Sequence, residues 1–304
     1  MTKKAFSLAL TLWIVAMMSL VSVLYLGHAK KIVQKTIKLN EKLQLTFDSE
    51  STIELLKFYI STGYIGGDKI INNEFKNVFP SFPSSLFIDG RQEVFDNRTI
   101  ILQDTAGLIN INDKEALSNY LFLDNVINED KRIIEDSITD WLDLDGVMSL
   151  NGAENSFYHG RKYLYGARNE SYFTSLEEVF LLRGMKKYTL LEKEKLYPSL
   201  IISNTIIRNL LTMKPLILGK VYGFTQNEIE QLVEAKKESS DYFLNLFYKF
   251  NFQNKNGERD GVFPSHILRM TVISDFDMVY KSITLLISFR ANKERVFEVL
   301  EYYD

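Results

Sequence analysis

The sequence has no cysteine among its 304 residues, and it has only three histidines and five prolines. The missing thiols exclude disulfides, thiolate metal sites and cysteine nucleophiles, and they remove any argument about redox compartment. His159 stands near an acidic segment, but a lone histidine is more often a surface side chain than a metal ligand. The sequence also shows no glycine-rich phosphate loop, zinc pattern or nucleophile elbow. Carboxylates are therefore the main candidates for chemistry.

The sequence has no excess of charge of either sign. It carries 36 lysines and arginines against 39 aspartates and glutamates, for a formal net charge of -3. Binding to nucleic acid usually shows as a basic patch or a basic domain, so nucleic acid is a poor first candidate as a partner. With 46% hydrophobic and 25% charged residues, the composition is that of a folded protein with one large or two modest domains.

One stretch lacks charge altogether, the run from Ala5 to Gly27. As a helix it would reach roughly 35 Å, enough for a hydrocarbon core of about 30 Å. A cleaved secretory signal ending at Ala29 is the weaker alternative, because its apolar core is usually about 7 to 15 residues. Lys3 and Lys4 on the leading side favour a cytoplasmic N-terminus. The sequence thus predicts a single-pass membrane anchor with the body outside the cytoplasm.

Beyond the anchor, apolar residues recur at near-helical spacing, which predicts that a long helix continues to about Tyr64. The prolines of "FPSFPSS" (79–85) indicate a connector. Asp89-Gly90 lies between two apolar runs and predicts a β-hairpin, and "RTIILQD" (98–104) predicts a further strand.

The middle of the chain reads as helical and the end as strands. Three capping-box-like pairs predict helix starts: Asn112 with Glu115, Thr174 with Glu177, and Thr225 with Glu228. From His266 onward, runs rich in Val, Ile, Tyr and Phe predict strands. This order predicts an α+β fold in which an antiparallel sheet domain carries a large helical insert. The predicted parts are a helix over 6–66, a sheet domain over 67–108 and 259–304, and an inserted helical domain over 109–258.

The segment "DWLDLDGVMSLNGAEN" (140–155) crowds four acids around two glycines. Three interpretations compete: a general acid/base pair, a cation site, and a solvated acidic loop. Carboxylate oxygens suit a hard cation such as Ca²⁺, which would also offset their mutual repulsion. An acid/base enzyme, for example a glycosidase, has no second acidic cluster nearby in sequence to support it. The candidate ligands are Asp140, Asp143, Asp145, Asn151, Glu154 and Asn155.

The segment is not an EF-hand. If Gly146 took the glycine position of that loop, Trp141 would stand at its first ligand position and Gly152 at its last. Any site must be irregular. In residues 143–145 the two aspartates alternate around a leucine, so an extended backbone would point both carboxylates to one side and Leu144 inward.

A second segment, "LGKVYGFTQNEIEQL" (218–232), faintly resembles a helix-hairpin-helix, a motif that can hold a nucleic-acid backbone through loop amides. The neighbouring Glu228, Glu230 and Glu234 favour an ordinary helix start instead. The alternative function that this segment supports is a membrane-tethered nucleic-acid-binding or uptake-pilus protein.

Three stretches follow one another in the chain: "LQDTAGLININ" (102–112), "DSITDWLDLDG" with "NGAENSFY" (136–158), and "SLEEVFLLRGM" (175–185). Together they resemble the general secretion pathway protein K family, the large minor pseudopilins of bacterial type II secretion. The resemblance implies a pilin-like fold with a helical insert, a structural calcium, no enzymatic activity, and a place at the tip of a short periplasmic fibre anchored in the bacterial inner membrane.

The resemblance also assigns roles at the N-terminus. It implies a prepilin-type leader over residues 1–5, cut between Ala5 and Phe6 by prepilin peptidase. Counting from Phe6, the fifth mature residue is Leu10, where fibre subunits of this kind usually have glutamate. The expected partners are the other minor pseudopilins, the major pseudopilin and the inner-membrane secretion assembly platform, and no nucleic acid.

Overall fold

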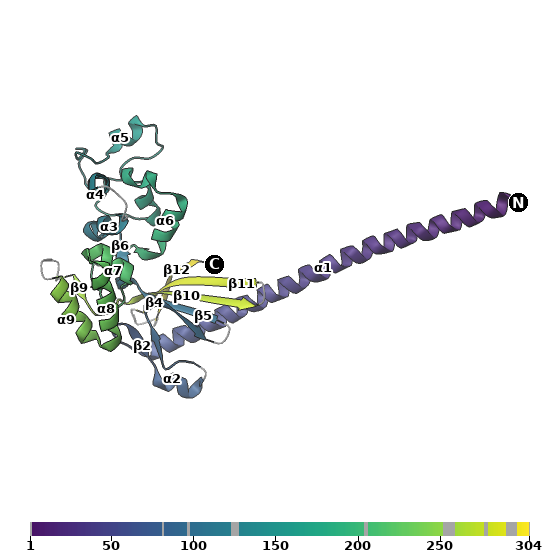
Figure 1. The fold of residues 1–304 in the computed structure, drawn as a ribbon, viewed down its shortest axis with the longest axis horizontal. Helices are drawn as coiled ribbons and strands as arrows, with labels where there is room; N and C mark the ends of the chain where they lie inside the picture. The colour runs from purple at the N-terminus through teal and green to yellow at the C-terminus, as the bar shows by residue number, and fades with distance from the viewer. Residues whose placement is uncertain are drawn as a thin grey trace.

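A computed structural model shows a long N-terminal helix that projects from a body made of two parts (Figure 1). The structure describes residues 2–80, 82–95, 98–122, 128–203, 206–251, 259–276, 279–289 and 297–303. Within the body, one part is a sheet domain packed on the end of the helix, and the other is a mainly helical insert at the far side from the N-terminus.

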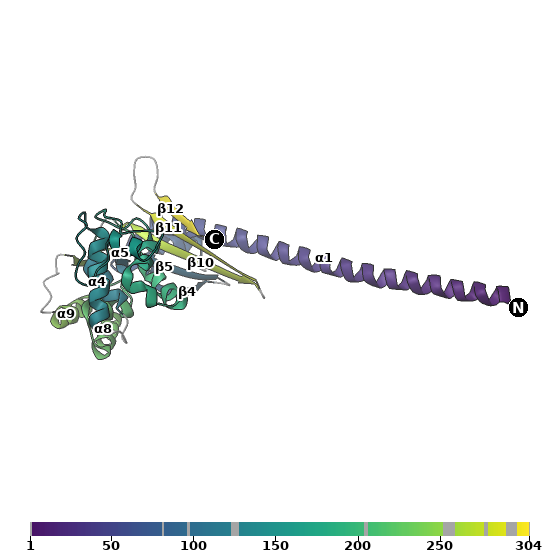
Figure 2. The same ribbon diagram turned by 90° about the horizontal axis from the view of Figure 1, so that it is seen from above.

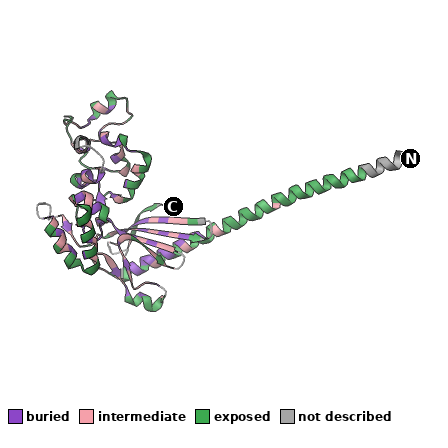
Figure 3. Cartoon of the chain, viewed as in Figure 1, coloured by how far each residue is buried: buried purple, intermediate pink, exposed green. Residues whose placement is uncertain are grey.

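Helix α1 runs without a break over Thr2–Thr62, close to the helix predicted to end near Tyr64. Over residues 10–40 it projects from the body and is exposed, apart from the half-buried Ala29 (Figure 3). Its C-terminal part packs into the body through Leu56, Tyr59 and Ile60, which are buried. The helix ends before Gly63, where a Cβ would lie 2.8 Å from a methyl group of Ile70. Glycine therefore lets the chain turn back closely against α1.

A five-stranded antiparallel sheet lies against the C-terminal part of α1, with strand order β12-β11-β10-β5-β4. Its strands are β4 (Asp89–Phe95), β5 (Arg98–Asp104), β10 (Ile267–Phe276), β11 (Val279–Ser288) and β12 (Glu298–Tyr303). Central strand β10 pairs on both sides, with Met270 opposite Leu102 of β5 and Leu285 of β11. Helix α1 contacts β10 and β11. Strands that flank the insert in sequence thus become neighbours in one sheet.

A smaller three-stranded sheet closes the base of this domain. It consists of β1 (Tyr64–Ile65), β2 (Lys69–Ile71) and β3 (Ser85–Phe87), with helix α2 (Asn73–Val78) between the last two. Phe82, from the proline-containing connector, is buried and its ring centroid lies 5.1 Å from that of Phe75 and 5.3 Å from that of Tyr59. The connector therefore contributes to the core beside α1.

The hairpin predicted at Asp89-Gly90 is wrong. Both residues lie inside β4, and the strand before them, β3, belongs to the other sheet. The pairing of β4 with β5 shifts register between Asp89 and Gln92, and Gly90 has φ +76°. A Cβ at Gly90 would come within 2.2 Å of Gln103 Oε1. The glycine thus provides the positive φ of a β-bulge instead of a hairpin turn.

The rest of the body is inserted between β5 and β10. Its helices are α3 (Lys114–Leu121), α4 (Asn128–Leu142), α5 (Asn155–Gly160), α6 (Leu190–Leu196), α7 (Pro215–Tyr222), α8 (Gln226–Glu238) and α9 (Ser240–Phe250). They are joined by the short 3-10 helices η1 (Thr105–Gly107), η2 (Leu176–Leu181), η3 (Arg183–Lys187) and η4 (Tyr197–Ser199), and by the two-residue strands β6 (Ile109–Asn110), β7 (Leu200–Ile201), β8 (Arg208–Asn209) and β9 (Asp260–Gly261).

The insert has a hydrophobic core of its own, which includes Trp141, Phe173 and Phe243, while Leu56 and Met270 belong to the core of the sheet domain. The predicted α+β fold with its long N-terminal helix is confirmed. The predicted C-terminal boundary of the insert, residue 258, lies outside the described residues.

Of the three predicted capping boxes, one forms as written. Thr225 and Glu228 cap α8 reciprocally. The other two predictions were off by one residue: the box before η2 uses Ser175 with Glu178, and Asp113 caps α3 without a box. At both places two adjacent residues can accept from a helix amide, and spacing alone does not choose between them.

The two parts of the body meet at the buried carboxylate of Asp104, the last residue of β5. Its Oδ1 accepts hydrogen bonds from the backbone nitrogens of Ala106 and Ser265 at 3.2 and 3.0 Å, and from the Ser265 hydroxyl at 2.5 Å. Its Oδ2 accepts from Asn209 Nδ2 at 2.9 Å and Thr212 Oγ1 at 3.2 Å. One side chain thus joins the start of the insert, its return segment and the approach to β10.

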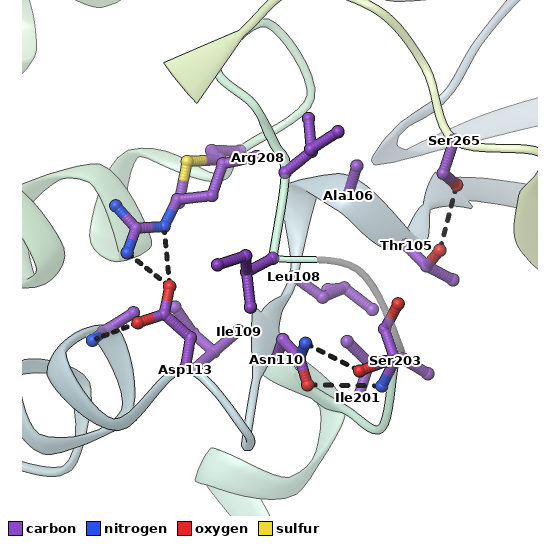
Figure 4. Close-up of a pocket in the computed structure, with 14 residues that line it drawn as sticks. Thr105, Ala106, Leu108, Ile109, Asn110, Asp113, Ile201, Ser203, Arg208 and Ser265 are labelled. Carbon is purple, nitrogen blue, oxygen red and sulfur yellow. Dashed lines mark hydrogen bonds and ion pairs between the residues drawn. The ribbon is translucent and has the colours of Figure 1, made fainter. Parts of the chain in front are cut away.

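Beside this joint lies the small pocket drawn in Figure 4. Its volume of about 20 Å³ has room for about one water. Asn110 Nδ2 donates to the Ser203 carbonyl at 2.9 Å, and Asn110 Oδ1 accepts from the Ser203 backbone nitrogen at 3.2 Å. Asp113 forms a buried ion pair with Arg208, and Arg208 also lies 3.4 Å from Asp260. The pocket is therefore part of a packed joint, too small for a ligand.

We predict that Asp104→Asn destabilises the protein by about 2–4 kcal/mol, because an amide nitrogen would face hydrogen-bond donors that the carboxylate now accepts from. Thermal unfolding of the full chain in detergent should show a lower Tm. The control is Asp241→Asn, which changes an exposed acid in the first turn of α9. A Tm for Asp104→Asn equal to that of the control would contradict the assigned role.

Candidate metal centre

The acidic segment begins inside α4. Asp140 lies in the last turns of that helix and is buried. Asp143 follows the end of the helix at Leu142, and its backbone nitrogen still donates to the Thr139 carbonyl at 2.9 Å. This continued helical turn holds the two aspartates at a spacing of three residues, on one side of the helix end.

The chain then returns, so that Glu154 meets the two aspartates. Carboxylate oxygens of Asp140, Asp143 and Glu154 all lie within 4.8 Å of one another. Glu154 is the N-cap of α5, and its side chain accepts from the Asn155 backbone nitrogen at 3.3 Å. A Cβ at Gly152 would lie 2.0 Å from Asp140 Oδ2, so only glycine lets the returning backbone pass this close to the carboxylate.

Asp140 is partly satisfied by the loop around it. Both of its carboxylate oxygens lie 3.1 Å from the backbone nitrogen of Ser149. By contrast, Asp143 Oδ1 and Glu154 Oε1 are buried and have no hydrogen-bond partner among the described residues. None of the three acids forms an ion pair with a basic side chain in the described part of the chain. The cluster therefore contains two buried acceptors that no described group satisfies.

The electrostatics of the cluster agree with this geometry. Desolvation, followed by repulsion from Asp145 and Asp140, raises the pKa of Asp143 above its ordinary value. Desolvation is also the main cause that raises the pKa of Glu154, with smaller contributions from Asp143 and Asp140. Such shifts are the expected result of gathering carboxylates without a compensating cation.

The other predicted ligands lie around the cluster instead of in it. Asp145 accepts from the Val147 backbone nitrogen at 2.8 Å. Asn151 donates from its backbone and side-chain nitrogens to Asp136 Oδ2, both at 3.0 Å. Asn155 Nδ2 donates to Asn169 Oδ1 at 3.1 Å. These contacts brace the loop, and the prediction that all six residues share one cation remains untested.

The sequence pattern missed two residues and misplaced a third. Asn169 donates to the Asp145 carbonyl at 2.8 Å and to Glu154 Oε2 at 3.4 Å, with φ +53°. Asparagine tolerates positive φ, but its distance in sequence from the acids gave no signal. Asp136 also escaped notice, although it stands one turn before Asp140. Leu144, predicted to point inward, is 76% exposed because residues 143–145 form a bend and not a strand.

The donor set fits a hard cation. Calcium accepts six to eight oxygen ligands in flexible geometry. Three carboxylates can therefore provide part of its coordination shell, and backbone carbonyls and waters the rest. One carboxylate oxygen from each of the three acids lies within 4.8 Å of the others. The two catalytic carboxyl groups of glycosidases are farther apart, at roughly 5–9.5 Å. His159 is exposed and does not belong to the carboxylate cluster. The arrangement therefore favours cation binding over acid/base chemistry.

The helix-hairpin-helix-like segment does form a helical hairpin. Helix α7 ends at Gly223, which has φ +72°, and α8 begins after Thr225. However, Glu228 Oε2 accepts from the Thr225 backbone nitrogen at 2.8 Å, and the Thr225 hydroxyl accepts from Glu228 in return. The capping box thus uses amides that a nucleic-acid phosphate would need.

The membrane-anchor prediction falls on α1. Among the described residues, one helix is long and apolar enough to cross a membrane; its most apolar window has a mean hydropathy of 2.0 and no buried residue. Leu10, on this helix, has a side chain that is 52% exposed. Ala5 and Phe6 lie in α1, but their side chains fall outside the described residues. The helix is consistent with a single-pass anchor.

Comparison with known proteins gives a family for the insert. Residues 110–202 match the family described as "Type II secretion system (T2SS), protein K". The matched range contains the whole carboxylate cluster. A comparison with curated proteins found no match.

Among solved structures, a match covers most of the chain. It is a chain of "The Crystal Structure of the GspK-GspI-GspJ complex from enterotoxigenic Escherichia coli Type 2 Secretion System". The match has a TM-score of 0.54 at 16% identity, and covers 88% of this chain and 98% of that chain. At this identity the likeness speaks for a shared fold. The insert thus matches the protein K family of the type II secretion system, and the chain as a whole shares the fold of a protein from a complex of that system.

Proposed function

We propose that this protein caps the tip of the periplasmic pseudopilus and helps to initiate its assembly for protein export. The observation that carries the proposal is the position of the insert: it occupies the end of the molecule away from the N-terminus of α1 (Figure 1). Pilin-like subunits stack with their N-terminal helices in one direction. A subunit added at the end of the fibre farthest from the N-terminal helices, above this one, would therefore collide with the insert. Subunits on the opposite side, below this one, would not.

Leu10 supports the same position. Fibre subunits usually carry glutamate there, whose carboxylate neutralises the N-terminal amine of a neighbour inside the helix bundle, where an unpaired charge is costly. A tip subunit has no neighbour above it to neutralise. Leucine also fits an ordinary membrane helix, so Leu10 adds to the argument from the insert and does not replace it.

The proposed partners are the other minor pseudopilins and the major pseudopilin. The matching solved structure is a complex of GspK with GspI and GspJ. Beyond the apolar window, α1 continues to expose large apolar side chains that another helix could cover; they are Ile32, Val33, Ile37, Leu39 and Leu43. In this proposal the chain is inserted in the inner membrane with its body in the periplasm, after cleavage by prepilin peptidase, and it engages the inner-membrane assembly platform.

We further propose a structural calcium at Asp140, Asp143 and Glu154. The orphaned oxygens of Asp143 and Glu154 support it, because a buried acceptor without a partner is destabilising unless a cation or water satisfies it. The ion would hold the end of α4 to the start of α5, and so fix the loop between them.

Calcium should raise the stability of the full chain. A ligand that binds only the folded state at about 100 times its Kd contributes roughly 2.7 kcal/mol. We expect a higher Tm in millimolar calcium than in EDTA, and loss of this difference in Asp143→Asn with Glu154→Gln. Asp145→Asn is the matched control, because Asp145 lies outside the cluster and should keep the response. Equal Tm values for the native chain in both solutions would rule out the metal centre.

The leader should be removed between Ala5 and Phe6. Mass spectrometry of protein extracted from membranes should find Phe6 as the first residue. Ala5→Arg, which replaces the small residue before the cut, should leave the leader attached. A mature chain that begins at Lys30 would indicate a secretory signal, and an intact Met1 would show that no leader is cut.

Complexes with the other minor pseudopilins should contain one copy of this chain, and a tag on it should label only fibre ends. Removal of the insert together with Leu10→Glu should allow incorporation along the shaft, since both obstacles to a subunit above are then gone. Label along the whole shaft of fibres built with the native chain would contradict the tip position. A salt-dependent shift of labelled DNA by the native chain would instead support the nucleic-acid alternative.

A further inference from the structure

The outer edge of the five-stranded sheet is open at β12. This strand pairs with β11 on one side, and no described residue pairs with its other side. Figure 2 shows β12 at the margin of the sheet, beyond β11. Residues 298–302 are exposed. An edge strand of this kind presents unpaired backbone N–H and C=O groups, which can template another strand.

A groove runs beside this edge, between β12 and α1. It has a volume of about 440 Å³, and Phe47 of α1 lines it together with Val299 and Tyr302 of β12. These three side chains are 68%, 42% and 53% exposed. A strand added to β12 would point every second side chain toward the α1 side of the sheet, because successive side chains alternate between faces. Apolar residues at those positions would cover the three exposed side chains.

The edge and its groove are acidic. The carboxylates in the groove are Glu50 and Glu54 of α1. On β12 itself the exposed acids are Glu298 and Glu301, and Glu301 lines a second pocket together with Arg269. The basic side chain in the groove is Lys57, which pairs with Glu54 at 2.6 Å and lies 5.2 Å from the centre of the Phe297 ring. Lys57 thereby ties α1 to the start of β12 while its charge is already compensated. The surface is thus complementary to a basic partner.

A second copy of this chain is a poor occupant. If two β12 strands paired, Glu298 and Glu301 of one copy would approach the same glutamates of the other, and like charges across a strand pair are destabilising. The partner should therefore differ in sequence and carry the opposite charge.

We propose that β12 is the docking strand for an extended segment of another protein, in which apolar residues alternate with basic ones. Backbone hydrogen bonds to β12 provide affinity, the groove at Phe47 accepts the apolar side chains, and the exposed carboxylate of Glu298 attracts the basic ones. This surface lies on the sheet edge, so it can be occupied while the exposed apolar face of α1 packs against other helices.

The test uses the full chain in detergent and a capped, fluorescently labelled peptide of alternating lysine and valine, about as long as β12. Anisotropy should show saturable binding, and hydrogen exchange should show new protection of the amides of residues 298–303. Two control peptides separate the contributions. One replaces lysine by glutamate, and the other carries N-methyl groups on alternate backbone amides, so that it cannot extend the sheet.

Two variants test the charge argument on the protein. Glu298→Lys should weaken binding of the lysine-valine peptide by roughly threefold to tenfold, since exposed ion pairs are individually weak. Glu238→Lys makes the same change of charge on the exposed end of α8, and should leave the affinity within about twofold. Both positions are exposed, so neither change is expected to disturb folding.

Four results would overturn the proposal: no saturable binding, equal binding of the N-methylated peptide, protection that appears outside β12, or a concentration-dependent dimer that protects β12 without the peptide. The first would show that the edge is closed to partners. The second would assign binding to the groove without strand addition. The last would identify a second copy of the chain as the occupant.

Discussion

The buried carboxylate of Asp104 is the constraint on which the relative placement of the two halves of the body depends. A carboxylate has no donor, so each of its contacts requires a donor from elsewhere. Asp104 receives donors from three separate segments, at Ala106, at Asn209 and Thr212, and at Ser265. A buried charge without these hydrogen bonds would be strongly unfavourable. These hydrogen bonds therefore fix one placement of the insert, which leaves the sheet after β5 and returns to it at β10.

The general form of the fold could be predicted from the sequence because its strongest signals are local. The charge-free run, the helical periodicity and the β-rich ends each lie within one segment and indicate α1, the insert and the sheet. The failures occurred where a local pattern fits two structures. Asp89-Gly90 offers a positive φ to a hairpin turn or to a bulge, and only the pairing of β4 with β5 decides for the bulge. Likewise, adjacent polar residues at 112–113 and 174–175 can each cap a helix.

The candidate metal centre was predictable in part, for a related reason. One short segment was enough to propose Asp140, Asp143 and Glu154, because acidic residues so near one another in sequence must either repel one another or share a cation. What could not be predicted was which acids converge. That depends on the close approach of Gly152 to Asp140 and on Asn169, which reaches the loop from another part of the insert. The resemblance to a known family pointed to calcium as the ion, and the geometry brings three of the six predicted ligands together.

Helix α1 runs unbroken from its apolar N-terminal half into the core of the sheet domain, so a membrane that held the N-terminal half would be mechanically coupled to the body. No glycine or proline interrupts the helix between Gly27 and Thr62, so that stretch contains no built-in hinge. A helix rises about 1.5 Å and turns about 100° per residue. One residue added to the exposed part of α1 would therefore move the body by only about 1.5 Å along the helix axis but rotate it by about 100° around that axis. The length of this helix, counted in single residues, would thus set which face of the body is presented to any neighbour anchored in the same way.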